Sequence, residues 1–178
     1  MALDPGSRST RLPKHERAIL KALRISAVLS TYHEDLTAEM LGSAWEELAS
    51  HGVDTQAACV VRAPGAFEIP LLARALARRK DIDAVLCFGL VLKGETTHDH
   101  WVSSAAIHGL MQVGLETDKP ILLGILTCNT LEQARARALP ASRGGKLDKG
   151  REVARAAVSA LLSLEAARRK HKKSKSKA

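Results

Sequence analysis

The chain has 178 residues, of which 46% are apolar and 3% are aromatic, so its core must be built mainly from Ala, Leu, Val and Ile. It holds no run of 18 apolar residues and no apolar segment near its start, which argues against a transmembrane helix and a secretory signal. The net charge of +8 comes almost wholly from the last eleven residues, which hold seven Arg and Lys. The rest of the chain is nearly neutral.

Composition along the chain predicts three parts: a disordered N-terminal arm over residues 1–22, one folded domain over residues 23–167, and a disordered Lys-rich tail over residues 168–178. Within the arm, residues 15–22 could form a helical turn. Three cysteines, Cys59, Cys87 and Cys128, lie in or just after apolar runs without C-x-x-C spacing. This pattern is typical of reduced core thiols, and it favours a cytoplasmic protein.

In the folded domain, apolar runs alternate with segments of helical periodicity. Gly52 fits the end of the first predicted helix, and Thr130 with Gln133 forms a predicted capping box at the start of the fourth. Strands that alternate with helices indicate an α/β fold with a parallel sheet. The predicted strands cover residues 24–29, 57–61, 84–92 and 121–126, and the predicted helices cover residues 34–51, 70–80, 100–116, 131–139 and 149–167.

The stretch from Gly89 to Val102 is the centre of the interpretation, because a fully apolar strand ends there in a polar loop and a helix follows. In open α/β sheets, ligands bind outside the carboxyl ends of the strands. The loops at that edge cover residues 31–33, 65–68, 94–98 and 127–130. Glycine, hydroxyls and helix N–H groups in the third loop suit a phosphate. His98 at its end can transfer protons near neutral pH.

Each of these residues also has an ordinary structural explanation. His98 could be a plain loop histidine, Arg137 a surface residue of its helix, and Phe67 a core residue. Glu68 could simply favour a helix N-terminus through the helix dipole. The sequence His98-Asp99-His100 suggests a metal, but no third ligand follows at a recognisable spacing, so we expect neither a metal nor a cofactor.

Three segments carry a resemblance to a known family: PGAFEIP at residues 64–70, GLVLKGETTH at residues 89–98, and LLGILTCNTLEQARARA at residues 122–138. In this order and spacing they resemble the lumazine synthase family over residues 24–162. The resemblance implies a flavodoxin-like three-layer sandwich with a four-stranded parallel sheet and helices on both faces. It also implies a transferase that condenses 5-amino-6-(D-ribitylamino)uracil with 3,4-dihydroxy-2-butanone 4-phosphate. The product is 6,7-dimethyl-8-ribityllumazine, the penultimate compound on the way to riboflavin, and phosphate and water are released.

The resemblance also assigns roles residue by residue. His98 matches the histidine that transfers protons, and Arg137 matches the arginine that holds the substrate phosphate. Tyr32 stands where a stacking phenylalanine is usual, and Leu123 where a phenylalanine from a neighbouring subunit closes the pocket. The remaining matches are the phosphate loop Gly94, Glu95 and Thr96, and the pyrimidine and ribityl contacts His33, Ala66, Phe67, Glu68, Leu90, Val91, Leu92 and Lys149.

Active sites in this family lie between adjacent subunits of a pentamer. The resemblance therefore implies a homo-oligomer, which is a pentamer, a decamer or a 60-subunit shell, and it makes riboflavin synthase a candidate partner. No membrane and no specific nucleic acid is expected. The chain departs from the family at His33, at Leu123, at residues 99–101, at Asp148 and in a longer loop between Arg137 and Lys149. One alternative is a binding or shell-forming protein with weak turnover, and another is a tail that binds polyanions electrostatically.

Overall fold

The computed structural model describes residues 12–175, with side chains as far as Arg169, so residues 1–11 and 176–178 lie outside it. Its elements, in chain order, are α1 (Lys14–Ala22), β1 (Ile25–Ser30), α2 (Glu34–Ser50), β2 (Val60–Ala63), α3 (Ile69–Ala77), β3 (Ala84–Leu92), α4 (His98–Thr117), β4 (Ile121–Cys128), α5 (Leu131–Ala138), the short 3₁₀ helix η1 (Ala141–Arg143) and α6 (Lys149–Lys175).

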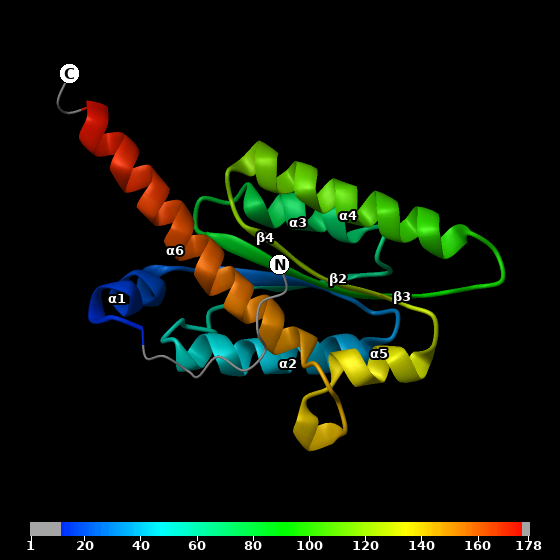
Figure 1. The fold of residues 1–178 in the computed structure, drawn as a ribbon. Coiled ribbons are helices and arrows are strands. Elements are labelled where there is room, and N and C mark those ends of the chain that lie inside the picture. Colours follow the sequence, from blue (N-terminus) through cyan, green and yellow to red (C-terminus); the bar gives the residue numbers. More distant parts are fainter. Residues whose placement is uncertain (1–11, 176–178) are drawn as a thin grey trace.

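The described elements form three layers around a four-stranded sheet with the strand order β2-β1-β3-β4. All strand pairs are parallel. Helices α3 and α4 cover one face, and α1, α2, α5 and α6 cover the other (Figure 1). This arrangement confirms the predicted α/β, flavodoxin-like sandwich. Because the strands are parallel, the loops that follow them lie at one edge of the sheet.

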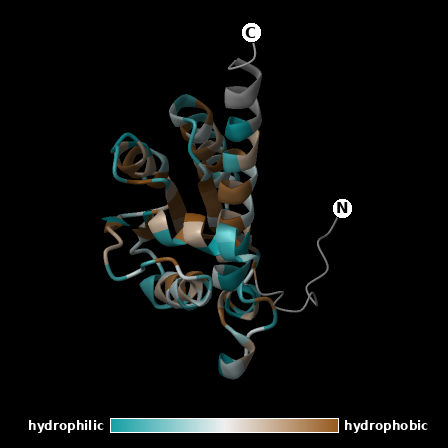
Figure 2. Ribbon diagram, turned by 90° about the vertical axis from the view of Figure 1, so that its left-hand side faces the viewer, coloured by the Kyte–Doolittle hydropathy of each residue, from teal (hydrophilic) through white to brown (hydrophobic). Residues whose placement is uncertain are grey.

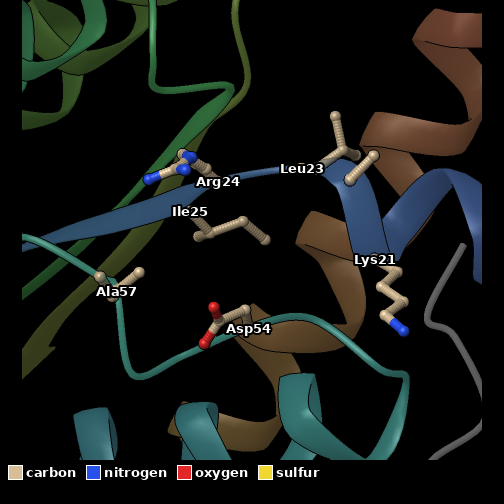
Figure 3. A pocket seen from close by; sticks show the side chains of 8 residues that line it. Lys21, Leu23, Arg24, Ile25, Asp54 and Ala57 are labelled. Carbon is tan, nitrogen blue, oxygen red and sulfur yellow. The ribbon is translucent and has the colours of Figure 1, made fainter.

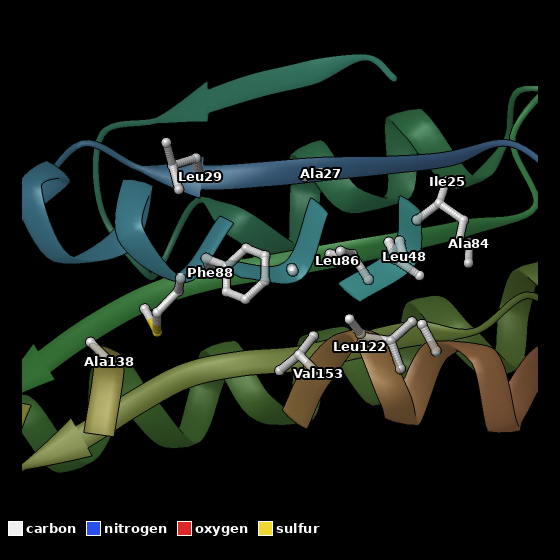
Figure 4. Packing of buried hydrophobic residues seen from close by; sticks show 14 of the residues in the cluster. Ile25, Ala27, Leu29, Leu48, Ala84, Leu86, Phe88, Leu122, Ala138 and Val153 are labelled. Atoms are coloured by element: carbon white, nitrogen blue, oxygen red, sulfur yellow. The ribbon is translucent and has the colours of Figure 1, made fainter. Parts of the chain in front are cut away.

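Strand β3 is buried along most of its length, as its continuous apolar run predicts for an inner parallel strand. Leu86 and Phe88 face the cluster under α2, α5 and α6 (Figure 4), whereas Val85 and Cys87 face α3 and α4. Figure 2 shows these hydrophobic strands as a middle layer between the helices. Gly124 on the neighbouring strand makes room for Phe88, because a Cβ there would lie 2.5 Å from the Phe88 ring.

The elements follow the predicted order, but several boundaries differ. The third strand has the predicted bounds, Ala84–Leu92. The second strand is Val60–Ala63 instead of 57–61, because Asp54 accepts a hydrogen bond from the Gln56 backbone and begins a turn just before it. Helix α3 ends at Ala77 and leaves residues 78–80 outside the helix.

Two predictions about helix ends, Gly52 after α2 and the capping box before α5, can be compared with the structure. Gly52 follows α2 with a φ of 90°, which is the predicted role at a helix C-terminus. The Thr130 side chain accepts from the Gln133 backbone at 3.3 Å, as predicted. In the return bond, Gln133 Oε1 accepts from the Asn129 backbone N–H at 3.0 Å, one residue earlier than in a standard capping box.

The two ends of the described chain are more helical than the sequence indicated. Residues 14–22 form helix α1, where only a helical turn over residues 15–22 was considered, and Leu20 is fully buried with Leu12 and Leu23 packed against the same cluster. Residues 1–11 of the predicted arm lie outside the described part. Helix α6 continues past Ala167 to Lys175 and takes in most of the predicted disordered tail. Ala, Arg and Lys are strong helix formers, and cations suit the C-terminal end of a helix dipole.

None of the described helices is long and apolar enough to cross a membrane.

Candidate functional site

A hollow of about 400 Å³ lies at the carboxyl edge of the sheet. The loops after β1, β2 and β3 and the first turn of α4 surround it. The hollow therefore lies at the sheet edge where the sequence predicted a ligand site. A space of this size is in the range of small-molecule sites. Its lining residues are Tyr32, Gly65, Ala66, Phe67, Glu68, Leu90, Val91, Leu92, Gly94, Thr96, His98, Asp99 and Val102.

Most of the predicted site residues meet in this hollow, but His33, Glu95, Leu123, Arg137 and Lys149 do not line it. Three lining residues were not predicted: Gly65, Asp99 and Val102. Gly65 belongs to the PGAFEIP segment, and Val102 lies one helical turn after His98, so both carried a signal in the sequence. Asp99 was considered only as a metal ligand.

The loop after β1 presents Tyr32 at the hollow, with 64% of its surface exposed. The Tyr32 backbone N–H donates to the Ser30 hydroxyl at 3.2 Å, which fixes the turn. His33 begins α2 with a φ of 60°, a conformation in which Asn, Asp and His are enriched. Its ring lies edge-on to that of Tyr32, with centroids 4.7 Å apart. His33 thus orients the tyrosine and does not itself line the hollow.

The loop after β2 contributes an exposed ring and a held carboxylate. Phe67 is 60% exposed, although a phenylalanine beside an apolar helix is usually in the core. Glu68 Oε2 accepts from the Gly65 backbone N–H at 3.1 Å, which closes the turn that precedes α3. Among the described hydrogen bonds only Oε2 is used, so Oε1 is available to a ligand hydroxyl.

The loop between β3 and α4 leaves backbone donors open at the start of a twenty-residue helix. The Lys93 N–H donates to the Cys128 carbonyl at 2.9 Å and ties the loop to the end of β4. Thr97, the residue before the helix, makes no side-chain capping bond, but Thr96 Oγ1 accepts from the His98 backbone N–H at 3.4 Å. Helix α4 begins at His98, two residues before the predicted start, so the imidazole lies in the same turn as these donors.

Gly94 in this loop is not required by the fold itself. Its φ lies outside the left-handed region, and a Cβ built there would meet nothing within 4 Å. A glycine that neither conformation nor packing demands is consistent with close approach of a ligand to the backbone.

Arg137 lies on α5, on the other side of the sheet from α4, and is exposed. Burial raises the pKa of the Cys128 thiol, and the nearby positive charge of Arg137 partly offsets that rise. Cys128 pairs in register with Leu92, which lines the hollow. Arg137 is therefore at the same sheet edge as the hollow, but outside it.

Lys149 is engaged within its own helix, where its Nζ lies 2.7 Å from Glu152 Oε1. The preceding residue, Asp148, has a φ of 47° and accepts from the Arg151 backbone at 3.1 Å. Aspartate tolerates the left-handed region nearly as well as asparagine. Asp148 can therefore precede α6 at the position where the family that the chain resembles usually has asparagine.

A second and smaller hollow of about 120 Å³ lies at the amino end of β1, between Arg24, Lys21 and Asp54 (Figure 3). It lies at the edge away from the strand-end loops, where open parallel sheets do not usually bind ligands. Within the described part of the chain, no three His, Cys, Asp or Glu side chains gather as a metal site requires.

The comparisons with known proteins agree with this geometry. The family described as 6,7-dimethyl-8-ribityllumazine synthase matches residues 22–165. A protein of this name from Salinibacter ruber is 45% identical over 136 residues, which are 76% of this chain and 84% of the relative. A Thermus thermophilus protein of the same name is 42% identical over 147 residues, 82% of this chain and 90% of the relative. A Caulobacter vibrioides protein named 6,7-dimethyl-8-ribityllumazine synthase 1 is 42% identical over 141 residues, 79% of this chain and 90% of the relative. The chain belongs to the 6,7-dimethyl-8-ribityllumazine synthase family.

Proposed function

We propose that this chain condenses 5-amino-6-(D-ribitylamino)uracil with 3,4-dihydroxy-2-butanone 4-phosphate to form 6,7-dimethyl-8-ribityllumazine, as its family membership implies. The observation that carries the proposal is the hollow at the sheet edge. It brings an exposed tyrosine, an exposed phenylalanine, a carboxylate, an open helix N-terminus and His98 together from three separate loops.

The aromatic and carboxylate side of the hollow takes the pyrimidine. Tyr32 and Phe67 offer exposed rings for a flat heterocycle, because offset stacking stabilises such pairs. The free oxygen of Glu68 accepts from ribityl hydroxyls, and the end of β3 at Leu90, Val91 and Leu92 offers backbone groups to the ring edge.

The opposite side of the hollow takes the phosphate. The first turn of α4 offers backbone N–H groups beyond that of His98, which pairs with Thr96, together with the positive end of the helix dipole. Gly94 lets the phosphate approach the backbone, and Thr96 adds a hydroxyl donor, with Glu95 contributing through its backbone. An arginine fork then holds phosphate oxygens in a bidentate manner, and we assign this role to Arg137.

His98 transfers the protons that the reaction moves. The substrate amine attacks the ketone and loses water to give an imine, phosphate then leaves, and ring closure expels a second water. An imidazole can accept and return protons near neutral pH. Holding the two substrates side by side supplies much of the remaining rate enhancement.

We further propose that the site is shared between copies of the chain. Trp101, Met111 and Leu115 on α4 are 66–74% exposed, and β4 is the edge strand beside them. Several large apolar side chains exposed along one helix favour an interaction surface there. Leu123 on β4 is 42% exposed, and Leu123, Arg137 and Lys149 lie outside the hollow of their own chain. A neighbouring copy in a homo-oligomer would use them, and the pentamer is the smallest of the assemblies that the family resemblance implies.

The assembly proposal has its own test. Met111→Glu should shift the particle to smaller species in light scattering and should lower turnover in parallel, because charge in an apolar interface is costly. Leu147→Glu is the matched control, because Leu147 is also exposed but lies away from α4, in the loop before α6. Full turnover by a monomer would contradict a shared site.

Cytoplasmic localisation, supported by the free thiols of the described cysteines, and association with riboflavin synthase remain predictions.

The reaction is tested by following lumazine absorbance after mixing the two substrates with the purified chain. Turnover that requires both substrates and releases phosphate in step with lumazine supports the proposal. The alternative, a protein that binds pyrimidine or flavin ligands with weak turnover, predicts tight ligand binding in calorimetry without lumazine formation above the uncatalysed rate.

A further inference from the structure

The end of α6 carries the densest charge of the chain. From Arg168 onward the sequence holds seven Arg and Lys, one His and no Asp or Glu. We call the described end of this helix, residues 168–175, the basic extension. Helix α6 runs without a break from Lys149 to Lys175, and its last turns project beyond the sheet and the other helices (Figure 1). Six of these seven cations therefore belong to a helix that leaves the body of the molecule.

The base of the basic extension lies at the edge of the sheet opposite the hollow. Arg168 Nη2 donates to the Asp118 carbonyl at 2.7 Å. Asp118 follows α4 and lies just before β4 begins at Ile121, so this contact marks the amino edge of the sheet. A partner bound to the basic extension would not cover the hollow at the carboxyl edge.

The sequence places no acidic residue within the basic extension. Glu165 pairs with Arg169 at 2.7 Å, and Glu165 is the last acidic residue of the sequence. The segment also lacks large apolar residues, because only Ala, Arg, Lys, His and Ser follow Glu165. It thus has no apolar face for insertion into a membrane surface, no aromatic or aliphatic anchor for a protein interface, and no ring for base stacking.

We propose that the basic extension binds the phosphate backbone of nucleic acid without reading its base sequence. Repeated phosphate charge is the chemistry that a run of Arg and Lys without anchors fits, since neutralising phosphates releases condensed counterions. This binding does not depend on the proposed enzymatic function. Because the two regions lie at opposite edges of the sheet, nucleic acid and the small substrates bind independently.

The test measures fluorescence anisotropy of a labelled duplex DNA with the full-length protein over a salt series. If about five phosphates are contacted, affinity should fall by about 10²–10³-fold between roughly 50 and 200 mM salt, and it should be equal for two unrelated sequences of one length. A salt-independent affinity, or a preference for one sequence, would overturn the proposal.

A matched pair of variants locates the charge. The first replaces Lys170, Lys172, Lys173 and Lys175 by Gln, which keeps helix propensity. It should weaken DNA binding by more than about tenfold and flatten the salt slope by about 3–4. The second replaces Lys14, Arg17, Lys21 and Lys80 by Gln and removes the same charge from the body. It should bind DNA as the wild type does, and equal weakening in both variants would overturn the proposal.

Two further measurements separate other partners and the enzymatic function. Tighter binding to polyglutamate or to phosphatidylserine vesicles than to DNA at the same salt concentration would assign the basic extension to an acidic protein or to a membrane instead. Lumazine formation should be unchanged in both variants. Loss of DNA binding with full turnover in the first variant would show that DNA binding does not depend on the enzymatic function.

Discussion

Gly150 at the start of α6 lies directly against the backbone of Met40 in α2. A Cβ at position 150 would come within 1.9 Å of the Met40 carbonyl oxygen, far closer than non-bonded atoms approach. Met40 is fully buried, and Gly150 is buried beside it. The absence of a side chain at this one position therefore allows the two helices to cross closely on the same face of the sheet.

Gly150→Ala should lower the stability of the chain, because the clash is with backbone and cannot be relieved by a side-chain rotation. Overpacking of this kind costs about 1–3 kcal/mol, which for a chain of this size corresponds to a fall of about 2–12 °C in melting temperature. The measurement is thermal unfolding followed by circular dichroism.

Gly42→Ala is the control for the same substitution in a helix. Gly42 lies within α2, and an added Cβ there would meet nothing within 4 Å. Alanine is the better helix former by about 0.5–1 kcal/mol, so this variant should melt slightly above the wild type. Equal melting temperatures for the two variants would contradict this explanation. The close contact with Met40 would then not be the reason for glycine at position 150.

Glu47 joins α2 to α6 through charge, and its side chain is only 12% exposed. Its Oε1 accepts from Arg155 Nε at 2.8 Å, with Arg151 Nε 3.7 Å and His51 Nε2 3.4 Å from the carboxylate. Burial alone would raise the pKa of Glu47, but the Arg155 hydrogen bond and the charges of Arg155, Arg151 and His51 outweigh burial. The pKa of Glu47 therefore lies below its ordinary value.

Glu47→Gln should destabilise the chain in a pH-dependent way. A carboxyl group whose pKa is lowered by folding stabilises the folded state above its unfolded pKa, and that contribution is lost as the pH falls through the folded pKa. Near neutral pH the variant should lose about 1–3 kcal/mol of unfolding free energy. The gap should close as the pH falls below 4.5, the ordinary value for this group. Urea unfolding over a pH series measures it.

Glu165→Gln serves as the comparison, because Glu165 pairs with Arg169 on the exposed side of α6. Exposed pairs contribute about 0–1 kcal/mol, so this variant should stay near the wild type at every pH. If the loss in Glu47→Gln is the same at all pH values, packing and not charge explains the role of Glu47.

The sequence predicted the central layer well and the ends poorly, for physical reasons. Strand β3 is apolar at every position and buried, so its signal did not depend on context. Helix α1 was anticipated only as a helical turn, because its nine residues are mostly polar and it is stabilised by burial of Leu20 against the cluster under α2 and α6. The end of α6 is helical despite its charge, whereas the prediction treated charge as disorder.

The candidate site was predictable where it follows strand ends and not where it depends on distant packing. The three loops that form the hollow follow β1, β2 and β3, so the topology alone brings Tyr32, Glu68 and His98 together. That Arg137 would lie outside its own chain's hollow does not follow from strand order. The position of Arg137 depends on how α5 packs against the opposite face of the sheet.

His98→Ala should lower turnover by about 10²–10⁴-fold, the usual share of general acid–base catalysis. Binding of the pyrimidine should change little, because the stacking rings and Glu68 are untouched. Steady-state kinetics and calorimetry measure the two quantities. His15→Ala removes an exposed imidazole on α1, whose Nε2 lies 4.0 Å from Glu16, and should leave turnover unchanged. If His98→Ala instead lowers melting temperature or particle size while turnover per folded site stays normal, the histidine is structural.

Arg137→Lys separates phosphate recognition from a surface charge, because a lysine keeps the charge but cannot form the planar bidentate fork. The Michaelis constant for the butanone phosphate should rise by roughly 10- to 150-fold, the equivalent of about 1.5–3 kcal/mol for a charge-assisted hydrogen bond. The constant for the pyrimidine should change much less. Arg135→Lys on the same helix, whose side chain is also exposed, is the matched control and should leave both constants as they are.

Inorganic phosphate gives a second measure of Arg137 that does not depend on turnover. A ligand that binds only the folded state raises the melting temperature in proportion to the logarithm of its excess over the dissociation constant. Phosphate should therefore protect the wild type and Arg135→Lys against heat more than Arg137→Lys. Equal protection of all three, together with unchanged Michaelis constants, would remove Arg137 from the site. The phosphate would then be held by the open N–H groups of α4 and by Gly94 and Thr96 alone.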